Sequence, residues 1–145
     1  MKLKRADIPS DLPLLAEMNQ QLIQDSGHRN PMTLPELQDR MLSFLSSDYT
    51  AVLFILDEKQ VGYALFQPRE DDLYIRQFFV RRAHRREGVG KKAFNVLKSE
   101  ILPPEKRLVL SVLCQNSIAL EFWRSVGFQD YCHTLEMLPE ARAEL

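Results

Sequence analysis

The order of apolar and polar residues along the chain predicts a succession of helices and strands. Apolar residues recur every three or four positions over residues 12–24 and again over 34–45, a spacing that predicts two amphipathic helices. A short alternating stretch at residues 2–6 predicts a strand before them. Asp11 and Thr33 stand just before the two helices. Side chains of these types cap helix N-termini, so we expect both residues to act as N-caps.

The middle of the chain changes from helical spacing to runs of β-branched and aromatic residues. Four such runs predict strands, at residues 49–56, 61–66, 73–80 and 108–113. Two further helical stripes predict helices over residues 88–100 and 116–126. We also expect residues 128–138 to supply one or two closing strands.

These elements predict an α/β fold, which can also be classed as mixed α+β. The order is β-α-α-β-β-β-α-β-α-β, and we expect residues 1–145 to form a single domain. The strand at 73–80, the helix at 88–100 and the strand at 108–113 form a right-handed parallel βαβ unit. The strands within 49–66 pair antiparallel. The prediction is therefore a central mixed, mostly antiparallel sheet with helices on both faces.

The composition is that of an ordinary globular protein. Of 145 residues, 45% are hydrophobic and 27% are charged, and no run approaches the roughly 18 apolar residues of a membrane span. The N-terminal sequence MKLKRADIPS lacks the apolar core of a signal peptide, so we expect a cytoplasmic protein with no membrane partner. Cys114 and Cys132 have no metal-ligand spacing. We expect both to be buried, unbonded thiols, and we expect no metal site.

Residues 85–90 read Arg-Arg-Glu-Gly-Val-Gly and connect a predicted strand to a predicted helix. The start of a helix leaves backbone N–H groups unpaired. Together with the positive end of the helix dipole, these donors form a site for an anion such as pyrophosphate. Gly88 and Gly90 have no Cβ, so the backbone can approach a ligand closely at these two positions. The turn is therefore our candidate ligand site.

The charge around this turn supports a phosphorylated ligand. Residues 76–92 carry seven arginines and lysines and a single acid, Glu87, for a net charge of +6. Because the whole chain has a net charge of −1, the remaining residues sum to −7. A patch this focused suits a small phosphorylated ligand better than a nucleic acid, which usually requires a broad basic face. We therefore expect no nucleic-acid partner, although a solvated run of charge beside a turn would give the same sequence.

Two nucleotide-binding motifs do not fit the glycine turn. A Walker-type loop ends in Gly-Lys-Ser/Thr, whereas Lys91 is followed here by Lys92. The sequence from Gly88 to Ala93 matches a variant of the dinucleotide-fold fingerprint. That fold also needs an acid about 20 positions further on to hold the ribose. Residues 108–113, which form the next predicted strand, contain no acid.

Two motifs resemble those of the GNAT superfamily, the CoA-dependent N-acetyltransferases. The glycine turn is similar to that superfamily's acyl-CoA-binding motif and reads Arg85-x-x-Gly88-x-Gly90. A second segment is similar to its Asn-x-x-Ala-x-x-Phe-Tyr-x-x-x-Gly-Phe motif and reads Asn116-x-x-Ala119-x-x-Phe122-Trp123-x-x-x-Gly127-Phe128. Both motifs occur in the family's order and among its elements. The resemblance therefore covers essentially the whole chain and implies a GNAT-like fold.

The resemblance implies that acetyl-CoA is the cosubstrate, and it implies which residues bind it. Backbone N–H groups of the turn would hold the pyrophosphate, and Asn116 and the strand backbone would bond the pantetheine arm. The N–H of Phe78 would stabilise the oxyanion by a few kcal/mol. Arg81, Arg82 or Lys92 is implied for the 3′-phosphate. The cofactor-binding residues so implied are Phe78, Val80, Arg85, Arg86, Glu87, Gly88, Val89, Gly90, Lys91 and Asn116.

The groups that transfer protons stay open at this point. Family members often carry a tyrosine as general acid where this chain has Trp123, whose indole N–H donates a hydrogen bond but delivers no proton. Packing in the core is the alternative interpretation of this side chain. The candidates for a general base are Glu70, Asp71, Asp72 and Tyr74. His28 and Arg29 lie in a loop that borders the acceptor site in this superfamily.

We therefore expect an acetyl-CoA-dependent N-acetyltransferase in which a primary amine attacks the thioester directly. The alternative is an acyl-CoA-binding or regulatory module with the same fold and little catalysis, and the residue at Trp123 favours it. The −7 balance outside residues 76–92 favours a cationic acceptor. By analogy with relatives, a homodimer is compatible with the fold.

Overall fold

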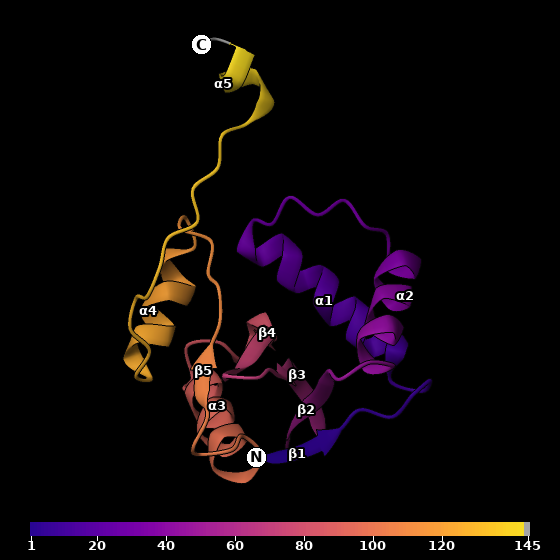
Figure 1. Ribbon diagram of the computed structural model, residues 1–145. Coiled ribbons are helices and arrows are strands. Elements are labelled where there is room, and N and C mark those ends of the chain that lie inside the picture. Colours follow the sequence, from indigo (N-terminus) through magenta and orange to yellow (C-terminus); the bar gives the residue numbers. More distant parts are fainter. Residues whose placement is uncertain (144–145) are drawn as a thin grey trace.

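The computed structural model describes residues 1–143 and has a central sheet covered by helices (Figure 1). In chain order the elements are β1 (Lys2–Arg5), α1 (Leu12–Ser26), α2 (Leu34–Leu45), β2 (Thr50–Leu56), β3 (Lys59–Pro68), β4 (Asp72–Val80), the short 3₁₀ helix η1 (Arg82–His84), α3 (Val89–Glu100), β5 (Arg107–Val109), α4 (Ser117–Ser125) and α5 (Pro139–Ala143). This order confirms the predicted one up to α4. None of the helices in the described part of the chain is long and apolar enough to cross a membrane.

The sheet has five strands in the order β1-β2-β3-β4-β5. The first four pair antiparallel, whereas β4 and β5 pair parallel, with Asp72 opposite Arg107 and Tyr74 opposite Val109. The mixed, mostly antiparallel sheet and its parallel βαβ unit are therefore confirmed. The predicted length of the last parallel strand was wrong, because β5 ends at Val109 and residues 110–113 leave the sheet.

One irregularity in the sheet changes the direction of the β4 side chains. Leu65 of β3 pairs with Gln77, but the next residue, Phe66, pairs with Ile75, so Arg76 is an extra residue in β4. An extra residue of this kind is a β-bulge, which reverses the alternation of side chains along the strand. Ile75 accordingly packs in the hydrophobic cluster on one face of the sheet, and Phe79 packs in the cluster on the other face.

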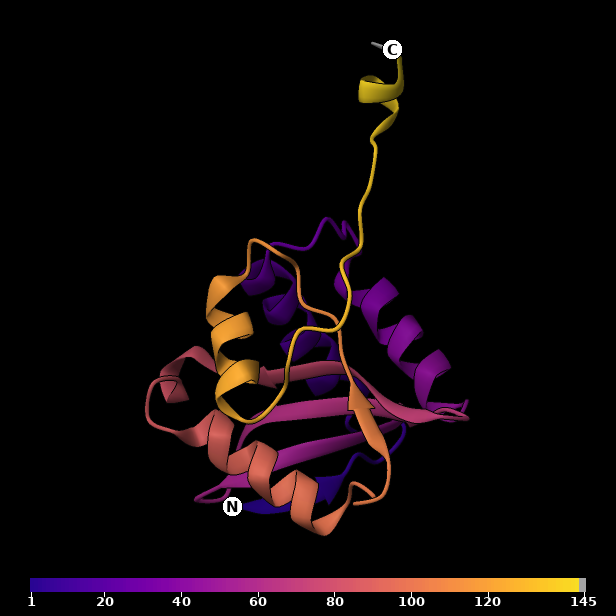
Figure 2. The same ribbon diagram turned by 60° about the vertical axis from the view of Figure 1, so that its left-hand side comes forward.

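Helices cover both faces of the sheet, as predicted (Figures 1 and 2). On one face, α1 and α2 bury Leu15, Met18 and Met41 against Tyr63 and Phe79. On the other face, α3 and α4 pack against the sheet, and their buried residues are Val89, Ala93, Phe94, Leu97 and Trp123. Burying an aliphatic or aromatic side chain contributes about 1.5–3 kcal/mol, so these two layers fix α1 and α4 relative to β4.

The two predicted N-caps have different outcomes. Thr33 forms a full capping box, in which its Oγ1 accepts from the N–H of Glu36 at 3.4 Å and its own N–H donates to Glu36 Oε1 at 3.0 Å. The Asp11 prediction was wrong. Its backbone is helical (φ −91°, ψ −4°) instead of extended, and its Oδ2 accepts from the N–H of Asp7 at 2.7 Å. The carboxylate therefore closes the turn before α1 and does not cap the helix.

The predicted closing strands at residues 128–138 are also wrong. These residues form no strand. Phe128 still packs against Trp123 of α4, and the later part of the segment runs away from the body of the molecule to α5 (Figure 2). The sheet edge that they would have joined is β5, which is only three residues long. Tyr131 and Leu135, which a strand would have buried, are exposed. Cys114 and Cys132 are exposed as well, which corrects the prediction of buried thiols: one lies in the turn before α4 and the other in this extended segment.

Candidate functional site

The candidate site begins where β4 and β5 separate. Their pairing covers residues 72–74 and 107–109 only, so the rest of β4 has no strand neighbour on that side. At the end of β4, the N–H of Arg81 donates to the carbonyl of Val61 on the β3 side at 2.8 Å. Backbone groups alternate in direction along a strand, so those of Phe78 and Val80 point away from β3 and into the opening. The backbone N–H and C=O groups of this part of β4 thus line a gap in the sheet.

The start of α3 supplies the second part of the site. The N–H of Lys92 donates to the carbonyl of Gly88 at 3.0 Å, so the N–H groups of residues 89–91 have no acceptor within the helix. Gly88 has a φ of +75°, and no atom lies within 4 Å of where its Cβ would be. Arg86 is also left-handed, with a φ of +67°. Left-handed residues at a helix start turn successive N–H groups toward one point, and this geometry suits an anion.

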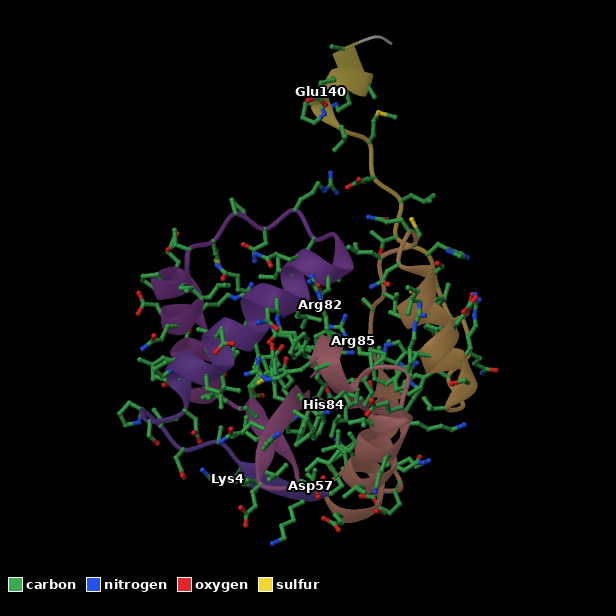
Figure 3. The ribbon with its side chains drawn as sticks, turned by 180° about the vertical axis from the view of Figure 1, so that it is seen from behind. Lys4, Asp57, Arg82, His84, Arg85 and Glu140 are labelled. Carbon is green, nitrogen blue, oxygen red and sulfur yellow. The ribbon has the colours of Figure 1, made fainter. Side chains whose placement is uncertain are left out.

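Several arginines near this turn are already paired with acids of α1. Asp25 accepts from Arg82 Nε at 2.9 Å and from Arg85 Nη2 at 2.6 Å, and Arg81 pairs with Glu17 at 3.2 Å. Figure 3 shows the two labelled partners of Asp25 next to each other beside α1. The basic patch is therefore partly neutralised. Its remaining cations without a salt bridge among residues 1–143 are Arg76, Arg86, Lys91 and Lys92.

Asp25 and Arg85 tie this turn to two other elements. Arg85 Nε donates to the carbonyl of Val80 at 2.7 Å, so the same guanidinium holds the end of β4 and the end of α1. Burial alone would raise the pKa of Asp25, but hydrogen bonds from Arg82 and Arg85 outweigh burial and lower this pKa. The carboxylate is therefore charged at neutral pH. Because the carbonyl of Val80 is occupied, its N–H is the group left for a ligand.

A cavity of about 670 Å³ connects the gap in the sheet with the start of α3. Eight of the ten residues predicted to bind the cofactor lie on its walls: Phe78, Val80, Arg85, Arg86, Gly88, Gly90, Lys91 and Asn116. The other two do not line it. Glu87 is exposed to solvent, and Val89 is buried in the core beneath α3. Gly90 is needed here for packing, because a Cβ would lie 3.2 Å from Phe122 of α4.

Asn116 stands at the N-terminus of α4 and reaches the same cavity. Its Oδ1 accepts from the N–H of Ala119 at 3.3 Å, so the side chain caps α4. An Asn side chain has separate acceptor and donor ends, and this contact uses only the acceptor. The Nδ2 group is therefore left to donate into the cavity.

Trp123 packs at the centre of an aromatic cluster. Its ring centroid lies 5.1 Å from that of Phe78, 5.4 Å from Phe94 and 5.2 Å from Phe128, each with edge-to-face geometry. The side chain is 8% exposed and also lies on the cavity wall. It is therefore a core residue that presents one part of its surface to the site.

A second cavity, of about 290 Å³, adjoins the first on the side of α1 and α2. Phe78, Asn116 and Trp123 line both cavities, so the two meet at the edge of β4. Of the groups considered as a general base, Tyr74 lies on its wall, whereas Glu70, Asp71 and Asp72 line neither cavity. His28 is on the wall as well, and the neighbouring Arg29 is turned outward to Glu136 at 2.8 Å.

Asp72 is held by arginines at the start of β4. Arg69 Nε donates to its Oδ1 at 2.6 Å, and Arg107 Nη2 lies 3.4 Å from its Oδ2. The hydrogen bond from Arg69 lowers the pKa of Asp72. This carboxylate joins β4 to β5 and is not available as a base in either cavity.

The smaller cavity contains polar residues that the sequence patterns did not single out. Asn19 is 1% exposed on the apolar face of α1, and its Oδ1 accepts from Arg40 Nη2 at 3.1 Å. The hydroxyl of Tyr63 donates to Gln77 Oε1 at 2.8 Å. Burial raises the pKa of Tyr63, so the hydroxyl remains a donor. The one available signal was Asn19, a polar residue four positions after Leu15 on the buried stripe.

The side chains of residues 1–143 do not form a metal-binding cluster. Within residues 1–143, no group of three or more His, Cys, Asp or Glu side chains lies close enough together to hold a metal ion. The donors gathered here are backbone N–H groups, amides and guanidinium groups, which bind anions and carbonyl oxygens.

Comparisons with known proteins identify the family and the fold. The sequence model of the Acetyltransferase (GNAT) family matches residues 15–128. An aminoglycoside antibiotic 6'-N-acetyltransferase from Acinetobacter haemolyticus shares the fold, with a TM-score of 0.75 and 16% identity over 95% of this chain and 97% of that one. An acetyltransferase from Thermus thermophilus gives a TM-score of 0.69 and 25% identity over 89% and 88%. A second aminoglycoside N-acetyltransferase, solved in complex with CoA, gives 0.75 and 13% over 94% and 93%. A search of curated proteins found no match.

Proposed function

The chain belongs to the GNAT family of acetyltransferases, and we propose that it transfers the acetyl group of acetyl-CoA to a primary amine by direct attack on the thioester. The observation that carries the proposal is the meeting of the two cavities at Phe78, on the open edge of β4. The larger cavity reaches the anion-binding turn at the start of α3. The smaller one offers a separate compartment for an acceptor.

The residues in and around the larger cavity support acetyl-CoA as the cosubstrate. The N–H groups of residues 89–91 and the left-handed Gly88 suit the pyrophosphate. The N–H of Val80 and the Nδ2 of Asn116 would bond the amides of the pantetheine arm, which would lie along β4 as an added strand does. Arg86, Lys91 and Lys92 are the cations left to neutralise phosphates, since Arg81 and Arg82 are engaged with acids of α1.

Phe78 would provide the electrostatic part of catalysis. Its N–H points into the opening where the cavities meet and would donate to the thioester oxygen as negative charge develops there. Removing a single oxyanion donor typically costs a factor of ~10²–10³ in kcat. Trp123 has no proton to give at neutral pH, so the thiolate would leave unprotonated, which is acceptable for a thiol with a pKa near ~8.5.

Deprotonation of the amine would occur before attack. Among the described residues, no Asp or Glu lines the smaller cavity. His28 and Tyr74 do line this cavity, but the proposal assigns the base role to neither. The amine would enter in its neutral form and lose its second proton to water. This predicts a kcat/KM that rises about tenfold per pH unit until the pH reaches the pKa of the acceptor amine.

The proposal is tested by following thiol release from acetyl-CoA in the presence of a panel of primary amines. Lys91→Glu, which reverses a charge on the cavity wall, should raise the KM for acetyl-CoA at least tenfold. Lys98→Glu makes the same charge change further along α3, outside both cavities, and should alter this KM less than twofold. No thiol release with any amine would overturn the enzyme proposal.

The alternative, an acyl-CoA-binding module with little catalysis, is favoured by one observation: Trp123 stands where a tyrosine often serves as general acid. Calorimetry with CoA separates the two functions. Binding that Lys91→Glu weakens, together with no turnover of any amine, would support the module. Turnover by the wild-type protein would exclude it.

A further inference from the structure

The smaller cavity contains two positive charges with no acid to neutralise them. Arg40 of α2 and Arg76 of the β4 bulge both lie on its wall. Neither makes a salt bridge with any residue between 1 and 143. Both guanidinium groups lie over the same ring, Phe44, at 5.4 Å and 4.8 Å from its centroid. The two cations are near enough to repel each other, because the charge of Arg76 contributes to lowering the pKa of Arg40.

The immediate partners of these guanidinium groups leave donors unused. Arg40 Nη2 donates to Asn19 at 3.1 Å, but its Nε is buried and has no partner in the described part of the chain. Within residues 1–143, the side chain of Arg76 makes a single hydrogen bond, to the hydroxyl of Tyr49 at 3.4 Å. Burial and then the positive charge of Arg76 lower the pKa of Arg40. An unneutralised cation at a half-buried position is unfavourable unless an anion joins it.

The other polar groups on this wall are also arranged to donate. Because the hydroxyl of Tyr63 donates to Gln77 Oε1 at 2.8 Å, the acceptor end of this amide is occupied and its NH₂ group is left free. His28 and Tyr74 also lie on this wall. The compartment thus presents guanidinium and amide donors to whatever molecule enters it.

We infer that the acceptor is a small molecule that carries a carboxylate as well as its primary amine, and that Arg40 and Arg76 bind this carboxylate. This inference rests on the proposed function, because it describes the acceptor of that reaction. The planar fork of arginine matches a carboxylate with two parallel hydrogen bonds. The volume of about 290 Å³ is at the lower end for ligand pockets and suits an amino acid or a short peptide.

A polycationic acceptor is the class that this cavity excludes. Two of the solved relatives are named for aminoglycosides, which are polyamines. Like charges at short range repel each other, and here two arginines would face each added ammonium group. The positive charge of the cavity wall also argues against the cationic acceptor expected from the sequence. That expectation came from the net charge of all residues outside 76–92 and not from the residues around the site.

The test compares acceptors that differ only in the carboxylate. Wild-type protein is assayed for thiol release with phenylalanine and phenethylamine, with leucine and isoamylamine, and with phosphoethanolamine as a differently charged anion. Compared at equal concentrations of the neutral amine, the amino acid of each pair should have a kcat/KM at least tenfold above that of its amine. Equal rates, or faster reaction of the plain amines or of phosphoethanolamine, would overturn the carboxylate inference and leave the acetyltransferase proposal standing.

Variants then assign the effect to the two arginines. Arg40→Gln and Arg76→Gln should each raise the KM for the amino acid at least tenfold, with the KM for acetyl-CoA and the rate with the plain amine little changed. Arg40→Lys, which keeps the charge, should restore part of the preference. Arg124→Gln is the matched control, because this arginine pairs with Asp130 outside both cavities. A preference that survives both glutamine variants would overturn the inference.

A binding measurement keeps the inference testable if no acceptor turns over. N-acetylphenylalanine, titrated by calorimetry into the protein with CoA present, should bind to wild type and bind at least tenfold more weakly to Arg76→Gln. Arg76 is exposed, so this variant is expected to fold, which a thermal melt checks. Binding without turnover would overturn the proposed function but retain the site. Absence of binding would overturn the site.

Discussion

Gly62 of β3 lies close to the backbone of β4, and its replacement tests how the sheet presents its open edge. A Cβ at this position would lie 2.0 Å from the carbonyl oxygen of Phe79, 3.0 Å from its carbonyl carbon and 3.1 Å from Val80 Cα. These are backbone atoms, which cannot rotate away as a side chain can. Glycine therefore stands here because another backbone occupies the space of a side chain.

The cost of Gly62→Ala follows from these distances. Ordinary contact begins at 3.4 Å, so the two strands would have to separate locally by about 1.4 Å. Overpacking of this kind costs ~1–3 kcal/mol, and two weakened ladder hydrogen bonds add ~1 kcal/mol each. A total of ~3–5 kcal/mol is a large part of the usual 5–15 kcal/mol of unfolding free energy. For a domain of this size, the melting temperature should fall by roughly 10–20 °C.

The assay is thermal unfolding, with the KM for acetyl-CoA as a second measurement. Gly27→Ala is the control, because it also replaces a glycine and its Cβ would have no atom within 4 Å. The left-handed φ of +75° there costs ~1 kcal/mol, or about 4 °C. Gly62→Ala should also raise the KM for acetyl-CoA, because Phe78 and Val80 move with the strand, whereas Gly27→Ala should not. Equal melting temperatures for the two variants would refute the steric argument.

Three further predictions concern single contacts. Thr33→Ala removes a capping box and should lower the unfolding free energy by ~1 kcal/mol in urea titrations, with activity unchanged. Tyr63→Phe leaves Gln77 Oε1 buried without its donor and should cost ~1–3 kcal/mol in the same titrations. Asp25→Asn should cost ~1–3 kcal/mol at pH 7, because the carboxylate is bonded to two arginines. Since the pKa of Asp25 is lowered in the folded protein, its contribution is complete above pH ~4 and is lost as the pH falls through the folded pKa. Urea titrations from pH 7 down to pH 3 should therefore show the stabilities of wild type and variant converging, and a constant difference would contradict the assignment.

Local patterns carried most of the fold and the outline of the larger cavity. The strand that ends at Val80, the left-handed Gly88 and the start of α3 are neighbours in the chain, so their arrangement follows from the order of strand, turn and helix. Asn116 could be placed by its motif because an N-cap is also a local feature. Thr33 and its capping box were predictable for the same reason.

Local sequence patterns could not predict the contacts between distant segments of the chain. Asp25 is 57 and 60 residues from Arg82 and Arg85, so a basic segment that looked unpaired in the sequence is partly neutralised by α1. Arg40 stands on α2, a helix that no sequence pattern placed at the site. The bulge at Arg76 depends on the register of β3, which residue types alone do not specify. The extended segment after Phe128 alternates as a strand would, yet β5 is too short to pair with it.

Helix α1 is a wall shared by both cavities. It holds the anion-binding turn through Asp25 and contributes Asn19 to the acceptor compartment, while Leu22 and Ser26 border both. A displacement of this helix by either ligand is therefore felt in the other compartment. Thermodynamic linkage requires the effect to be reciprocal: whatever factor CoA applies to acceptor affinity, the acceptor applies to CoA affinity. Helix α1 is thus the element through which binding of one substrate would change the affinity for the other.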